Sequence, residues 1–146
     1  MLWPMFRLAL PFLCACAASP GDSGTATNRA CDDGGGVDTW VAGLEKITAD
    51  GATVRLLDAV PTPPDVGPNR FVVEVDGFAG SAIGLRPWMP LHGHGTVPEW
   101  HQGSQNGSSW TFEEIDLFMA GLWELTFTID SDDPTTGAQF RFCLEG

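Results

Sequence analysis

The strongest structural signal in the sequence is Trp123-Glu124-Leu125-Thr126-Phe127-Thr128-Ile129-Asp130, in which large apolar and polar side chains alternate strictly. Successive side chains of an extended backbone point to opposite faces, so this alternation predicts a β-strand with one buried and one solvated face. We expect Trp123, Leu125, Phe127 and Ile129 to lie in a core and the intervening Thr and Glu side chains to face solvent.

Other segments repeat this alternation more weakly. They are residues 71–76, with Phe71, Val73 and Val75 in phase, residues 81–88, with Ile83 and Leu85, and residues 140–144, with Phe140, Phe142 and Leu144. Residues 40–48 and 53–59 flank Ala49-Asp50-Gly51-Ala52, whose Asp-Gly pair is typical of a hairpin turn. Each of these segments is expected to contribute one apolar face.

Prolines and turn residues divide the strands. Pro61, Pro63, Pro64 and Pro68 exclude helix and central strand from their segment. The Asn-Gly pair within 104–107 predicts a hairpin of residues 97–102 with 109–117. The apolar phase slips between Phe112 and Ile115, which indicates a bulge.

Six or seven strands at this spacing predict an all-β fold, an immunoglobulin-like antiparallel β-sandwich of about seven strands. Residues 40–146 have the length of one domain. The sequence has no long amphipathic helix pattern, which argues against an α/β enzyme fold.

The N-terminus has the features of an export signal. Arg7 precedes the short apolar core of residues 8–13, which cannot span a bilayer. Leu13-Cys14-Ala15-Cys16 looks like the lipobox of bacterial lipoproteins, which makes residues 1–15 a signal peptide and Cys16 the lipidated first residue. The alternative is an ordinary secretory signal cleaved near Ala18.

Residues 16–39 are rich in Gly, Ser, Thr, Ala and Asp, a composition that predicts a flexible tether. The whole chain carries a net charge of −12, and processing at Cys16 removes one cation, so that 6 Lys and Arg face 19 Asp and Glu at −13. This charge argues against nucleic-acid partners and against binding to anionic lipid surfaces. The lipid would then provide the membrane attachment.

Two cysteines remain after processing, Cys31 and Cys143, one at each end of the folded region. In an oxidising compartment they are expected to form a disulfide, worth about 4 to 5 kcal/mol in the chain-entropy model. Because Cys143 has the opposite phase to Phe142, the disulfide should lie on the outer side of the last strand and fasten the tether across it.

The only concentrated ligand chemistry is Trp88-Met89-Pro90-Leu91-His92-Gly93-His94-Gly95. On an extended backbone His92 and His94 would point to the same face and could share one metal ion. A thioether beside two imidazoles favours copper, especially Cu(I). The alternative is a tight glycine turn whose histidines bond backbone carbonyls, with the methionines as core filler.

The expected hairpin decides which further residues reach this segment. It returns residues 118–121 to the side of His94 and carries His101 to the far turn, ~20 Å away. We therefore predict Met89, His92, His94 and Met119 as copper ligands and His101 as a surface residue. Trp88, Phe118 and Trp123 are interpreted as core aromatics near the site.

Catalytic patterns are lacking in the sequence. It contains no Gly-x-Ser-x-Gly motif, and no cysteine is left over for catalysis, so we expect no enzyme. The run Asp130-Ser131-Asp132-Asp133 lacks the spacing of a calcium loop and is interpreted as a solvated turn.

The segments Met89-Pro90-Leu91-His92-Gly93-His94 and Met119-Ala120-Gly121-Leu122-Trp123-Glu124 together resemble the YtkA-like domain family of exported bacterial proteins. That family typically shows a Met-Pro-x-x-x-His-Gly segment and then Met-Pro-Gly-Leu-Trp-Glu. Here Ala120 replaces the usual proline. The resemblance covers about residues 40–144 and implies an anchored immunoglobulin-like sandwich. It also implies an association with copper handling and oxidase assembly, with Met89, His92, His94 and Met119 at the recurring positions.

Two main hypotheses follow. The first is a lipid-anchored protein of the bacterial cell envelope, facing the periplasm or the exterior, that carries or buffers copper for an envelope copper protein or oxidase. The second is a metal-free structural or adaptor lipoprotein that docks another envelope protein through its Trp88 and Trp100 region. A third is a hydrolase or carbohydrate-binding module that uses exposed tryptophans.

Overall fold

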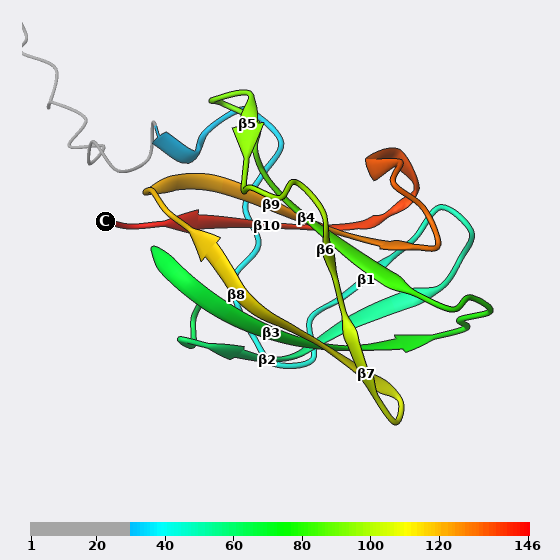
Figure 1. Cartoon of the computed structure of the whole chain (residues 1–146). Helices are drawn as coiled ribbons and strands as arrows, with labels where there is room; N and C mark the ends of the chain where they lie inside the picture. Colours follow the sequence, from blue (N-terminus) through cyan, green and yellow to red (C-terminus); the bar gives the residue numbers. More distant parts are fainter. Residues whose placement is uncertain (1–29) are drawn as a thin grey trace, which may run out of the picture.

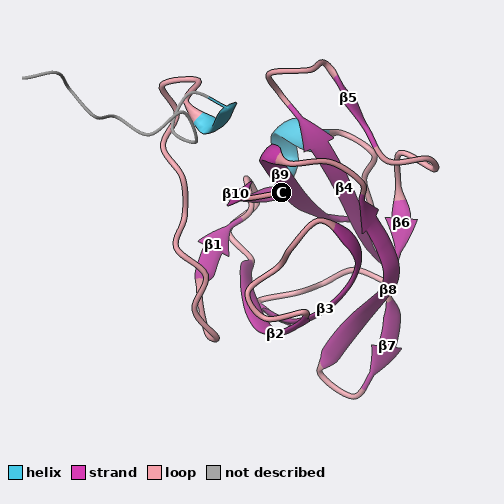
Figure 2. Ribbon diagram, turned by 90° about the vertical axis from the view of Figure 1, so that its left-hand side faces the viewer, coloured by secondary structure: helices cyan, strands magenta, loops and turns pink. Residues whose placement is uncertain are grey.

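The computed structural model describes residues 30–146 as two antiparallel β-sheets packed face to face (Figures 1 and 2). The first sheet has the order β1 (Glu45–Ile47), β2 (Thr53–Val60), β3 (Gly67–Asp76), β8 (Ser109–Leu117) and β7 (Ser104–Asn106). The second has the order β10 (Ala138–Leu144), β9 (Gly121–Ile129), β4 (Ile83–Met89) and β5 (His94–Gly95), and β6 (His101–Gln102) also pairs with β4. A 3₁₀ turn, η2 (Pro134–Thr136), precedes β10.

The connectivity is that of an immunoglobulin-like sandwich. In the nomenclature of that fold, β2, β3, β8 and β7 take the places of strands A, B, E and D. β10, β9 and β4 take the places of G, F and C, with β5 and β6 beside C. The predicted fold is thus confirmed. Six of the described strands have seven or more residues and form the sandwich, whereas β1, β5, β6 and β7 have two or three.

The alternation at 123–129 places the core as expected. Trp123, Leu125 and Phe127 are fully buried, and Phe127 packs edge-on against Phe112 of β8 and Phe140 of β10. These rings join the two sheets, and burying a side chain of this kind contributes roughly 1.5 to 3 kcal/mol each. Ile129, at the end of β9, is only partly buried against this core.

The outer face of β9 differs from the expectation, because Thr126 and Thr128 are also buried. The chain after η2 lies directly over them. A Cβ atom at Gly137 would be 2.5 Å from Thr126 Cγ2 and 2.7 Å from the Phe127 carbonyl oxygen, so only glycine permits this approach. Alternation alone could not show that a later turn covers the outer face.

The expected hairpin of 97–102 with 109–117 is wrong in its first strand. The Asn-Gly turn is present, but it joins β7 to β8, and Ser104 is the first residue paired with β8. His101 and Gln102 instead pair with β4 of the second sheet. The chain crosses between the sheets at Gly103, whose amide donates to the Ile83 carbonyl and whose missing side chain leaves room for the Phe112 ring.

Pro68 was excluded from a central strand, yet it is the second residue of β3, opposite Asp116 of β8. The pairing of β2 with β3 ends at Val60 and Arg70. At Pro68 the strand therefore has a partner on one side only, which is the edge-like setting that proline tolerates. The bulge is confirmed: the register shifts between Asn69 and Phe71 opposite Glu114, which has a φ of 54°.

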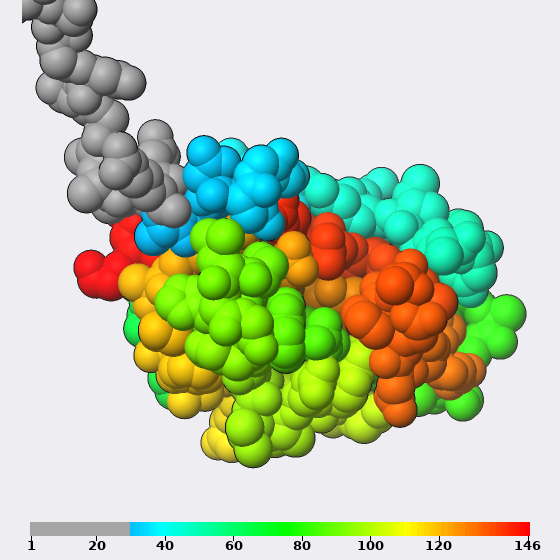
Figure 3. Space-filling view, turned by 90° about the horizontal axis from the view of Figure 1, so that it is seen from above, coloured from blue at the N-terminus to red at the C-terminus, as the bar shows by residue number. Residues whose placement is uncertain are grey.

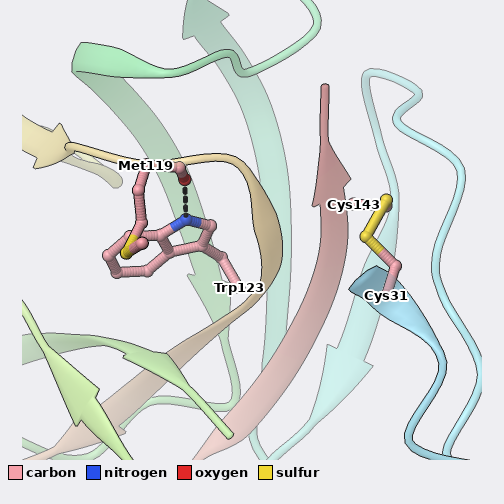
Figure 4. Close-up of a disulfide and its surroundings, with 4 residues drawn as sticks. All are labelled: Cys31, Met119, Trp123 and Cys143. Atoms are coloured by element: carbon pink, nitrogen blue, oxygen red, sulfur yellow. Dashed lines mark hydrogen bonds between the residues drawn. A yellow bond between two sulfur atoms is a disulfide. The ribbon is translucent and has the colours of Figure 1, made fainter. Parts of the chain in front are cut away.

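The described part of the predicted tether, from Ala30 onward, lies against β10. Cys31 and Cys143 form the expected disulfide, with Cα atoms 5.5 Å apart, on the outer side of the strand (Figure 4). Arg141 of β10 donates to the Gly36 carbonyl and pairs with Asp33 and, at 3.2 Å, with Glu124. Between residues 30 and 146, no helix combines the length and hydropathy needed to cross a bilayer.

Candidate functional site

His92 lies on the tight turn between β4 and β5, and His94 is the first residue of β5. The amides of His92 and Gly93 both donate to the Met89 carbonyl, at 3.1 and 2.9 Å, and Gly93 has a φ of 69°. The backbone is therefore a tight turn, which was the alternative prediction, and the extended segment assumed for the metal site is wrong. The rings of His92 and His94 nevertheless approach, with centroids 5.5 Å apart and planes at 70°.

The β8–β9 turn meets this segment. The Phe118 ring stacks on His94 with centroids 5.7 Å apart and packs edge-on against Trp123 at 5.5 Å. This contact confirms that residues 118–121 return to the side of His94. His92 is exposed and His94 half-buried, so one imidazole is held by an aromatic neighbour while the other extends towards solvent.

The two predicted thioether ligands lie deeper than the histidines. Met89 is fully buried and stands directly opposite His94 in the β4–β5 ladder, so both side chains leave the sheet on the same face. A Cβ atom at Gly121 would be only 3.0 Å from the Met89 methyl group, which shows that the methionine fills the space under β9.

Met119 is half-buried, and its sulfur lies against the indole of Trp123 (Figure 4). The Trp123 indole nitrogen donates to the Met119 carbonyl at 2.9 Å and so fixes the turn. A thioether on an aromatic ring is a favourable core contact. The structure thus brings His92, His94 and Phe118 together at the surface, with Met89 beneath them and Met119 packed on Trp123.

His101 is not at the far turn. It stands opposite Leu85, four residues before Met89 on β4, or about 13 Å along the strand. Its Nε2 lies 2.9 Å from the Thr96 hydroxyl, and burial lowers the pKa of its ring. His101 is therefore a half-buried residue of the second sheet, separate from the His92–His94 pair.

Of the three expected core aromatics, only Trp123 is in the core. Phe118 is 47% exposed, and Trp88 faces outward with the Arg86 guanidinium 4.0 Å from its ring centroid. The sequence held a signal for Phe118: once the bulge is counted, Ile115 and Leu117 point inward and the next residue must point outward. The prediction of Phe118 as a core aromatic was therefore wrong, and it gave no indication of the stack on His94.

The donor set defines what the site can bind. Within residues 30–146, no cluster of three or more His, Cys, Asp or Glu side chains could hold a metal ion. A metal on His92 and His94 must therefore complete its coordination with a thioether, water or a group from another molecule. Imidazole with thioether suits copper, and Cu(I) accepts low coordination numbers with such ligands.

Residues 1–15 and Cys16, predicted as signal peptide and lipidation site, lie outside the described residues. Comparison with protein-family models, with curated proteins and with solved structures gave no match to this chain. The similarity to YtkA-like proteins therefore remains a prediction from two short motifs.

Proposed function

We propose that this protein is a lipid-anchored sandwich of the bacterial cell envelope that binds one copper ion as a carrier or buffer. His92 and His94 are the primary ligands, and Met89 and Met119 are the thioether candidates. Copper is the cargo, and it leaves by ligand exchange with a partner such as an envelope copper protein or oxidase, so no catalytic step is involved.

The observation that supports this proposal is the approach of two imidazole rings to 5.5 Å on a hydrogen-bonded turn. The turn restrains the backbone of both residues, and the Phe118 stack restrains the His94 ring before a metal arrives, which reduces the conformational entropy lost on binding. The exposed His92 leaves the copper accessible to an acceptor, as ligand exchange requires. Met89 stands opposite His94 in the β4–β5 ladder and shares its face of the sheet.

The test is a copper titration of the purified mature protein in detergent, with a chromophoric Cu(I) chelator as competitor and with Cu(II) in parallel. We expect one equivalent to bind and the double variant His92→Ala/His94→Ala to lose it. His101→Ala is the matched control, since it removes an imidazole outside the site, and it should bind as the wild type does. Met89→Leu and Met119→Leu then identify the thioether.

A second candidate, a metal-free adaptor, is favoured by the packing of both methionines, because Met89 is fully buried and Met119 lies on Trp123. Phe118 and Leu91 are also 47% and 44% exposed, as docking residues would be. If neither Cu(I) nor Cu(II) binds, the carrier function is contradicted and the adaptor function remains.

A further inference from the structure

The loops of the sandwich gather at two ends, and the histidines are at one of them. We call the histidine end the group formed by the turns at 61–66, 89–94 and 118–120 and the C-terminal residues 145–146. The strand pairing places them together: Gly121 is opposite Leu144, and Gly67 is opposite Leu117. The opposite end contains residues 49–52, 77–82 and 130–137, which are also joined to one another.

The chain from the predicted anchor reaches the domain at the histidine end. A Cβ atom at Gly121 would lie 3.6 Å from the Ala30 carbonyl oxygen and 3.0 Å from the Met89 methyl group. Ala30 thus stands beside the base of the histidine turn. Figure 3 shows the first described residues, in blue, against the light-green segment that contains this turn, with the C-terminus in red nearby.

The length of the preceding segment limits the distance to the bilayer. Ala30 follows Cys16 by 14 residues, which span at most about 50 Å when fully extended. The opposite end is farther from the anchor by the length of β9, nine residues or about 30 Å. Because the chain enters the domain beside Gly121, an anchor at Cys16 would be attached to the histidine end and not to the opposite end.

The charge distribution bears on the contact made there. All five Lys and Arg side chains within residues 30–146 form ion pairs: Lys46, Arg55, Arg70, Arg86 and Arg141. None of them lies in the turns of the histidine end. The exposed carboxylates at or beside this end, which have no ion pair in the described part of the chain, are Asp32, Asp65, Asp116 and Glu145.

Apolar side chains are also exposed at this end. Leu91, Phe118 and Val66 are 44%, 47% and 38% exposed. Exposed apolar side chains together with polar ones are typical of a protein–protein interface, which has an apolar core and a polar rim. The same carboxylates are repelled by anionic lipid headgroups, so close contact with the lipid itself is disfavoured.

We propose that the histidine end is a docking face held towards the membrane, and that its partner is a membrane protein that presents a basic surface there. The inference rests on the proposed function for the anchor at Cys16 and for the metal site that the two proteins would share. Negative rim charges would raise the association rate with such a partner and make it sensitive to salt.

The orientation is tested with the lipidated mature protein in phosphatidylcholine vesicles that contain a lipid-linked gadolinium chelate, because gadolinium, unlike nickel, is not bound by imidazoles. Leu91→Cys carries a spin label at the histidine end, and Asp132→Cys carries it at the opposite end. We expect the gadolinium to relax the label at residue 91 more strongly. Equal or reversed relaxation, or absence of the diacylglyceryl mass on Cys16, would overturn the proposal.

The basic partner is tested with a fluorescent decalysine peptide at low salt. Asp116→Asn/Glu145→Gln should weaken its binding at least about threefold, whereas Asp50→Asn/Asp132→Asn, which removes the same charge from the opposite end, should have a smaller effect. Equal effects of the two pairs, or no binding by the wild type, would overturn the docking face. A copper titration of the same samples tests the metal site independently. If the histidine end faces the membrane but no copper binds, only the metal site is contradicted.

Discussion

His94 and Phe118 stack with ring centroids 5.7 Å apart and planes inclined by only 17°. His94 begins β5 of the second sheet, and Phe118 follows β8 of the first sheet. This one contact therefore joins the two sheets at the histidine end. It restrains the half-buried imidazole, whereas His92 has no stacked partner among the described residues. The stack makes Phe118 the residue through which the fold controls the histidine pair.

Substitution Phe118→Leu should weaken the proposed copper binding by about 2- to 10-fold. An aromatic pair of this kind is worth about 0.5 to 1.5 kcal/mol, and without it His94 must be ordered by the metal. The measurement is the chelator competition described above. Phe78→Leu is the control, since Phe78 packs on Trp110 with ring centroids 5.9 Å apart, away from the histidines. An unchanged affinity in Phe118→Leu would show that the stack has no role in the site.

Substitution Gly121→Ala should destabilise the protein by about 3 kcal/mol or more. Gly121 has a φ of 129°, which alanine rarely adopts, and the added methyl would press on Met89 at 3.0 Å. Gly107→Ala is the matched control, because its φ of 64° lies in the left-handed well and no atom is within 4 Å. It should cost about 1 to 2 kcal/mol. Urea unfolding measures both, and equal losses would contradict the predicted contact.

Removal of the Cys31–Cys143 disulfide should lower the free energy of unfolding by about 4 to 5 kcal/mol, because the bond closes a loop with a sequence separation of 112. The comparison is urea unfolding of the wild type and of Cys31→Ser/Cys143→Ser. The variant should also be cleaved by protease between residues 32 and 37, since Asp33 and Gly36 are then held mainly by Arg141. A loss below 1 kcal/mol would indicate that these polar contacts suffice.

The protein should lose stability as the pH falls below about 6.5, in part through His101. Burial lowers the pKa of the folded ring below its ordinary value of 6.5, so the unfolded chain takes up a proton first. The stabilisation is therefore present above pH 6.5 and is lost as the pH falls through the folded pKa. Urea unfolding at pH 7.5 and 5.5 measures it.

His101→Gln should show a smaller loss between these two pH values than the wild type does. The carboxylates titrate in both proteins, so the difference between the two losses isolates the imidazole. An identical pH dependence would mean that His101 is charged as readily in the folded as in the unfolded state.

Much of the fold was predictable because its signals are local. The alternation at Trp123, Leu125 and Phe127 marked the central strand, and the phase slip before Ile115 marked the bulge. The His101 prediction failed because Gly103 moves the chain from one sheet to the other. A crossing of this kind depends on which strands are already neighbours, and a periodicity of two residues carries no such information.

The sequence by itself determined where the six long strands lie, which face of each enters the core, and which two cysteines pair. Alternation and composition encode these properties within a few residues of each position. Only the tertiary structure decided that Phe118 meets His94, that Gly137 buries Thr126, and that Ala30 lies beside Gly121. These contacts join segments far apart in the chain, and they arise only when two twisted sheets pack and bring their connecting turns to a common end.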